Sequence, residues 1–218
     1  GITVAVSSLA GVLISFYGGY ISDRIGRPMV MLVSVFSWAG VFFIFSSAQH
    51  LWVFFIANTL NGLCRAFFEP TSRALLSDTT PSQHKLLVFN LRYAAINLGV
   101  VFGPIIGLYL GSAESTFPFI IAGMVYVMYG LVLLFQFSVR HTDLPRPVDA
   151  LAPSLRSALS TTTRDRVFLM VLIGTTFCEL GYGHFGSTLA QYLTLNPNIE
   201  NGSQIFSYMF SLNAMTVL

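Results

Sequence analysis

The chain has 218 residues, of which 54% are hydrophobic and only 9% are charged, and its mean hydropathy is +0.71. A soluble domain of this size carries about a quarter charged residues. This composition therefore excludes an ordinary water-soluble globule and indicates an all-α chain whose solvent is the lipid bilayer. The formal net charge of +2 provides no basic face of the size that nucleic-acid binding requires.

Apolar runs of about twenty residues predict membrane-spanning helices, because a helix that rises ~1.5 Å per residue needs that length to cross ~30 Å of hydrocarbon. In chain order the runs are Ile2–Ile21, Met29–Ala48, Leu51–Phe68 with an extension as far as Leu76, Leu86–Gly111, Phe117–Phe137, Val167–Leu193 and a seventh from near Gln204. The chain begins inside one run and ends inside another, so we expect further helices on both sides.

The loops between these runs alternate in charge. Segments 22–28, 77–85 and 138–166 hold eight Lys and Arg residues, whereas segments 49–50, 112–116 and 194–203 hold none. The positive-inside rule places the first set in the cytoplasm. Segment 138–166 is the only long polar stretch, so we predict a linker there between two membrane units, 1–137 and 167–218.

The cytoplasmic segment "GYISDRIGRP", residues 19–28, must reverse the chain between two helices within a few residues. Gly26 can adopt the positive φ that a tight turn needs, and Pro28 suits the first turn of the next helix. Asp23 can cap a helix or pair with Arg24 or Arg27. This order of residues is more specific than a generic basic turn.

The third apolar run carries a polar face. Asn58, Asn61, Arg65 and Glu69 are spaced by three, four and four residues, which places them on one side of a helix. Arg65 lies about 21 Å from the outer end of the run, where an isolated charge is costly. Two interpretations stay open: an Arg65–Glu69 pair that orders the bundle, or a cavity-lining arginine that meets a substrate or a proton-carrying acid.

Glu179 lies near the middle of the sixth run and has no basic residue within four positions. Burial disfavours its charged form, which makes Glu179 a candidate proton carrier. The alternative is a protonated glutamic acid that donates a hydrogen bond to a neighbouring helix.

The fourth run carries small residues at regular intervals. Gly99, Gly103, Gly107 and Gly111 recur every four residues, and Pro104 removes one helix hydrogen bond. We expect this stripe, like Gly18 and Gly19 before the first turn, to let another helix approach closely. Ordinary small-residue packing and a functional motif are both compatible with the pattern.

Two of these segments resemble a known family. Residues 19–28 match the loop signature G-x-L-a-D-r-x-G-r-k of the major facilitator superfamily, with Pro28 as the one departure. The resemblance implies the major facilitator fold, an incomplete chain that covers about helices 2 to 8, and two six-helix units joined by 138–166. It also implies a cytoplasmic gating motif formed by Gly19, Asp23, Arg24, Gly26 and Arg27.

The fourth run, "NLGVVFGPIIGLYLG", resembles the G-x-x-x-G-P-x-x-G motif in helix 5 of the drug–proton antiporters of this superfamily, through Gly99, Gly103, Pro104 and Gly107. Leu108 replaces a glycine often found after Gly107. The preceding "RYAAINLG" also looks like bacterial multidrug exporters of this group. The resemblance therefore implies proton-coupled efflux, and the polar residues already noted, Asn58, Asn61, Arg65, Glu69 and Glu179, are the candidate residues of a proton and substrate cavity.

We therefore expect a multi-pass protein of the cell membrane that works by alternating access and exports small lipophilic or cationic compounds. The alternatives are a proton-coupled importer of a small solute such as a sugar or peptide, and a non-transporting receptor with the same fold. No enzyme motif, catalytic residue or metal site stands out in the sequence. We expect a monomer whose partners are a small-molecule substrate and the bilayer, with no cofactor besides the coupling proton.

Overall fold

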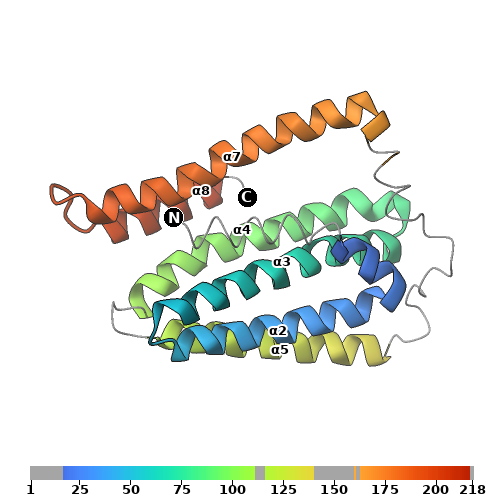
Figure 1. Cartoon of the computed structure of the whole chain (residues 1–218), viewed down its shortest axis with the longest axis horizontal. Helices are drawn as coiled ribbons and strands as arrows, with labels where there is room; N and C mark the ends of the chain where they lie inside the picture. The colour runs from blue at the N-terminus through green and yellow to red at the C-terminus, as the bar shows by residue number, and fades with distance from the viewer. Residues whose placement is uncertain (1–16, 111–115, 140–159, 161–162, 217–218) are drawn as a thin grey trace. The chain divides into compact units, whose positions relative to one another are not determined.

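The computed structural model describes residues 17–110, 116–139, 160 and 163–216, and the side chains of 179, 180 and 182–187 lie outside this described part. Residues 17–25 are helical and end just before the first complete helix. Figure 1 shows the helices α2 (Arg27–Ser47), α3 (Leu51–Thr79), α4 (Lys85–Leu110), α5 (Phe117–Val139), α7 (Arg166–Leu195) and α8 (Gly202–Thr216), with a 3-10 turn, η1, at Ser82–His84.

The predicted runs from Met29 onward are confirmed as helices, whereas most of the first run, Ile2–Ile21, lies outside the described residues. The bounds of α2, α4, α5 and α7 agree with the predicted ones to within two residues, and four helices of the described part are long and apolar enough to cross a membrane. The helix α3 is longer than predicted and continues to Thr79. Its 29 residues span about 44 Å, so its last turns extend past the ~30 Å hydrocarbon layer.

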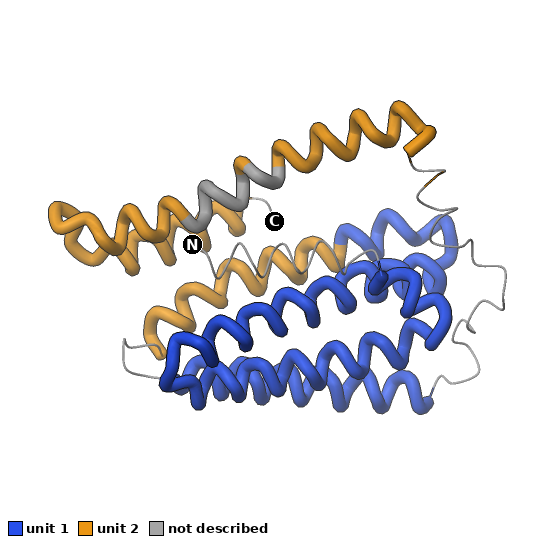
Figure 2. The backbone as a smooth tube through the Cα atoms, in the orientation of Figure 1, with its two compact units in different colours: residues 1–90, 111–152 blue, residues 91–110, 153–218 orange. Residues whose placement is uncertain are grey.

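The chain forms two compact units that share α4, as Figure 2 shows: residues 1–90 with 111–152, and residues 91–110 with 153–218. The predicted division of the chain at 138–166 stays a prediction, because this grouping describes contacts within 218 residues only.

In the first unit, α2 lies against both α3 and α5. Two glycines on α5 make the second contact close. A Cβ added at Gly123 would lie 2.8 Å from Cε1 of Phe43, and one added at Gly130 would lie 2.8 Å from Cζ of Phe36. The two glycines are seven residues apart, and so are the two phenylalanines, but their order along the two helices is reversed. Two phenylalanine rings of α2 thus fill the spaces above two glycines of the antiparallel α5.

The contact between α2 and α3 is built from small and branched side chains. Val41, Ala57 and Cys64 form its buried cluster, and the rings of Trp38 and Phe45 cover it. Much of the remaining apolar surface is exposed, including Phe135 at 68% and Met124 at 61%. Exposed apolar surface of this extent suits a bilayer and would not suit water.

In the second unit, α7 and α8 form an antiparallel pair, and α8 also contacts the second half of α4. The side chain of Asp165 caps α7 by accepting from the amides of Val167 and Phe168, each at 3.0 Å. The hydroxyl of Ser211 donates to the carbonyl of Val101 at 2.7 Å, and the Tyr109 and Tyr208 hydroxyls lie 3.4 Å apart.

Candidate functional site

The turn before α2 has the geometry that its sequence predicts. Gly26 has φ 104° and ψ 130° and is buried, and its amide donates to the Ser22 carbonyl at 3.1 Å. A residue with a Cβ rarely adopts this φ, so glycine is required here. Pro28 lies in the first turn of α2, where its missing N–H leaves no helix hydrogen bond unmade. Together they end one helix and start the next within a single residue.

This turn positions Arg27 between two carboxylates. Its Nη2 atom lies 3.3 Å from Oδ1 of Asp23, and its Nη1 atom forms an ion pair with Oδ2 of Asp78. Asp78 lies near the end of α3, so the cluster joins the turn to the far end of the helix hairpin. Arg27 is 19% exposed and the aspartates 39% and 38%, so water reaches the cluster and the two bonds can break and re-form.

The sequence offered the Asp23–Arg27 pair as one of several roles for Asp23, and Asp78 was missed. The signal was present, because α2 and α3 are antiparallel neighbours and the end of α3 must return to the level of residue 27. An acidic residue on the last turn of α3 was therefore the obvious partner for a basic turn.

The other members of the predicted gating motif lie outside this cluster. The guanidinium of Arg24 lies over the ring of Tyr20, 4.7 Å from its centroid. A Cβ added at Gly19 would meet no atom within 4 Å, whereas one added at Gly18 would lie 3.0 Å from the Ala66 carbonyl oxygen. Among the described residues, the close helix approach predicted for both glycines is thus found at Gly18 and not at Gly19.

On α3 the ion pair that the structure shows for Glu69 is not the Arg65–Glu69 pair, which was one of the two interpretations left open by the sequence. Glu69 pairs with Arg73 instead, through Oε2 and Nη2 at 3.2 Å. Both arginines are four residues from Glu69, but a glutamate that precedes its cation by four residues is the favoured order. Arg73 also lies nearer the cytoplasmic end, where both side chains can reach water. Arg65 remains exposed and forms no ion pair with a described residue.

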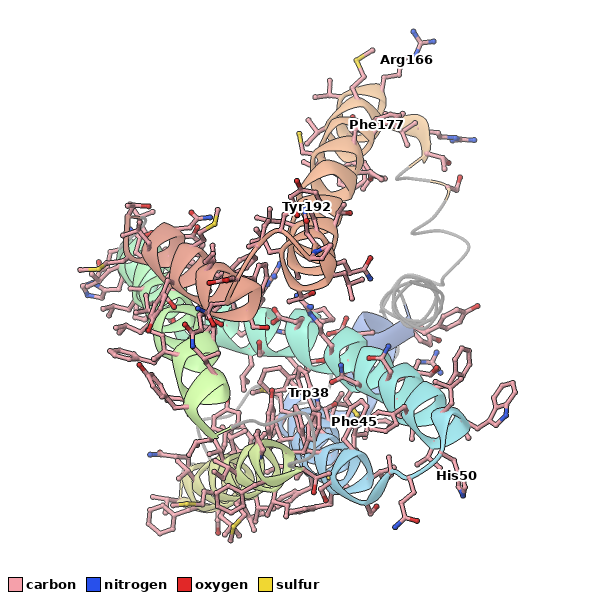
Figure 3. All side chains as sticks on the ribbon, turned by 90° about the vertical axis from the view of Figure 1, so that its left-hand side faces the viewer. Trp38, Phe45, His50, Arg166, Phe177 and Tyr192 are labelled. Carbon is pink, nitrogen blue, oxygen red and sulfur yellow. The ribbon has the colours of Figure 1, made fainter. Side chains whose placement is uncertain are left out.

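Asn61 and Arg65 lie beside aromatic side chains of α2 and α5. The Trp38 Nε1 atom donates to Oδ1 of Asn61 at 2.5 Å, and the Trp38 ring lies 5.0 Å from that of Tyr126. Arg65 and Glu69 both interact electrostatically with the Tyr126 hydroxyl. The polar face of α3 therefore adjoins the aromatic rings of α2 and α5. Trp38, which contacts both, is labelled in Figure 3. Asn58 lies on the same face and is half-buried.

The glycine stripe of α4 is not closely packed. Gly99, Gly103 and Gly107 are exposed, and a Cβ added at any of them would meet no atom within 4 Å. The predicted close approach of another helix is therefore not met among the described residues, because none of them covers this face. The helix continues through Pro104 to Leu110.

Two further expectations concern the second unit and metal binding. The Glu179 side chain lies outside the described residues, so its role as a proton carrier stays a prediction. Within the ranges that the structure describes, no three His, Cys, Asp or Glu side chains are grouped so as to hold a metal ion.

Comparison with known proteins decides the family. The sequence profile of the Major Facilitator Superfamily matches residues 1–218, the whole of this chain. The chain belongs to the major facilitator superfamily. The long apolar helices, the basic loops and the family together place it as a multi-pass protein of the cell membrane with an incomplete major facilitator fold.

Among its relatives in this superfamily, the chain is 52% identical over its full length to the uncharacterized MFS-type transporter YqjV of Bacillus subtilis (strain 168), of which it covers 53%. It is 28% identical over 79% of its length to a Na(+), Li(+), K(+)/H(+) antiporter of Planococcus maritimus, of which it covers 44%. It is 24% identical over 97% of its length to the quinolone resistance protein NorA of Staphylococcus aureus, of which it covers 56%. The chain thus spans about half the length of these relatives.

Proposed function

We propose that the full-length protein is a secondary active transporter that exports small lipophilic or cationic compounds in exchange for protons by alternating access. The Asp23–Arg27–Asp78 cluster is the observation that carries this proposal. It joins the turn between two helices to the end of a third by partly exposed ion pairs. Exposed pairs contribute about 0–1 kcal/mol each, so such a contact can be made and broken in every transport cycle.

Two further observations support the direction and the coupling. The similarity to NorA covers nearly the whole chain and favours export. Glu69 and Glu179 are acidic residues that lie away from the ends of the apolar helices α3 and α7. In this proposal the proton is the coupling ion and the protein works as a monomer, with Glu179 carrying the proton and Glu69 held by Arg73.

The test uses everted membrane vesicles that contain the full-length protein, with a pH-sensitive dye to follow the proton gradient. Ethidium added to energised vesicles should dissipate the gradient and accumulate inside. Glu179→Gln should abolish gradient-driven accumulation while ethidium binding persists, because the substitution removes the exchangeable proton at nearly constant shape.

The control is Glu200→Gln, which changes an exposed glutamate in the turn before α8 and should leave transport intact. Undiminished transport by Glu179→Gln would move the proton site elsewhere, and Glu69→Gln would then be measured in the same vesicles. Accumulation in the opposite direction would indicate an importer.

A second candidate function is the exchange of monovalent cations for protons, which the similarity to the Planococcus maritimus antiporter favours. The same vesicles separate the two functions. Dissipation of the gradient by NaCl, LiCl or KCl, without ethidium, would indicate cation exchange. A response to ethidium alone would favour export of lipophilic cations.

A further inference from the structure

Trp38 determines which atom of the Asn61 amide faces α2. Its Nε1–H group donates to Oδ1 of Asn61 at 2.5 Å. An indole nitrogen can only donate a hydrogen bond, so the oxygen of the amide must be the atom turned toward it. The Nδ2 group of Asn61, with its two N–H donors, is consequently on the side away from Trp38.

The Trp38 ring is itself held in place from two helices. It meets Phe68 of α3 edge-on, with 5.9 Å between the ring centroids, and Tyr126 of α5 at 5.0 Å. Aromatic contacts of this geometry contribute about 0.5–1.5 kcal/mol each beyond area burial. The indole therefore has little freedom to turn away, and the Asn61 amide cannot flip without losing its partner.

Asn61 and Arg65 present donors side by side. They are four residues apart and share one face of α3. Among the described residues, neither the Nδ2 group of Asn61 nor the guanidinium of Arg65 donates a hydrogen bond to another side chain or carbonyl. Both groups carry N–H donors and no acceptor in this arrangement, and Arg65 carries a positive charge well inside the span.

We propose that Trp38 is a positioning residue that makes the Asn61–Arg65 face a donor surface, and that the compounds the protein binds best carry a carboxylate or a comparable acceptor besides their lipophilic body. This inference rests on the proposed export function and narrows its substrate class. A carboxylate can take two parallel hydrogen bonds from Arg65 and a third from Asn61, while the rings of Trp38, Phe68 and Tyr126 accommodate the apolar part. A compound that is only cationic, such as ethidium, would gain none of these hydrogen bonds and would meet the like charge of Arg65, so it should be exported but bound more weakly.

The test measures binding of two dyes that differ in one group, rhodamine B with a free carboxylate and its ethyl ester without one. Fluorescence anisotropy is recorded with the purified full-length protein in lipid nanodiscs. The wild type should bind rhodamine B about ten-fold more tightly than the ester, a difference of ~1.4 kcal/mol. Trp38→Phe keeps an aromatic ring but removes the donor, and it should lower this preference to about three-fold or less.

The chain provides a matched control, because it holds two tryptophans and the second, Trp52, is 74% exposed at the start of α3. Trp52→Phe should keep the wild-type preference. Asn61→Asp retains an acceptor for Trp38 but replaces the two N–H donors by a second oxygen. It should shift the binding preference from rhodamine B toward the ester. If Trp38→Phe folds poorly, the dye preference of Asn61→Asp alone tests the proposal.

An unchanged preference in both Trp38→Phe and Asn61→Asp would overturn the positioning role and leave the export proposal standing. Equal or tighter binding of the ester by the wild type would overturn the substrate class. A measured dye preference without any gradient-driven export in vesicles would instead contradict the export function, so the two proposals fail separately.

Discussion

In α5, Gly123 and Gly130 each lie under a phenylalanine ring of α2, whereas in α4, Gly99, Gly103 and Gly107 face no described atom. The first pair is spaced by seven residues, as are the two rings that fill it, and the second set is spaced by four. The α5 glycines are thus explained by packing within the first unit. Those of α4 are not explained by any contact inside the described chain.

The comparison teaches that a regular glycine spacing identifies a face on which another helix can approach, and does not identify the partner. At Gly123 and Gly130 the partner is α2, and the gap is closed by aromatic rings rather than by a bare backbone. The α4 stripe resembles the motif of drug–proton antiporters, and no described residue packs on it. A helix that covers this stripe would have to come from outside the described residues. Three substitutions, ordered by expected effect on stability, sharpen this contrast.

The largest effect is expected for Gly130→Leu. The new side chain would occupy the space of the Phe36 ring, whose Cζ atom already lies 2.8 Å from an added Cβ. Overpacking of this kind costs roughly 1–3 kcal/mol. Thermal unfolding of the full-length protein in detergent should show a clear drop in Tm, and the double variant Gly130→Leu/Phe36→Ala should recover much of it. Independent, additive effects of the two changes would mean that the ring and the glycine are not in contact.

An intermediate effect is expected for Asp78→Asn, which breaks a charged contact of α2 rather than an aromatic one. Arg27 keeps Asp23 as a partner, and exposed ion pairs contribute about 0–1 kcal/mol, so the Tm should fall less than for Gly130→Leu. Under the proposed function the cluster is made and broken in each transport cycle, so transport should fall further than stability. Arg24→Gln, which leaves the cluster untouched, serves as the control for loss of charge in this region.

Much of the fold could be predicted because the length of an apolar run and the width of the bilayer leave little choice. The turn at Gly26 and Pro28 could be predicted for a similar reason, since few residues can reverse a chain in one step. The partner of Glu69 was less certain, because Arg65 and Arg73 are equally far along the helix and only the modest preference for a glutamate that precedes its cation favours Arg73. The Trp38–Asn61 bond joins two helices, and neither spacing nor composition reveals such a contact.

The smallest effect on stability is expected for Gly103→Leu. A side chain added there enters open space in the described structure, so the 1–3 kcal/mol of overpacking expected for Gly130→Leu should be absent. A leucine also favours a helix over glycine by up to ~1 kcal/mol, which would offset minor losses. The Tm of the full-length variant should therefore stay close to that of the wild type. The measurement pairs Gly103→Leu with Gly130→Leu in one detergent at matched protein concentration, with ethidium export assayed in parallel. A Tm drop as large as that of Gly130→Leu would show that a helix outside the described residues covers the stripe. An unchanged Tm with lost export would instead indicate that the stripe is covered only in another conformation of the transport cycle.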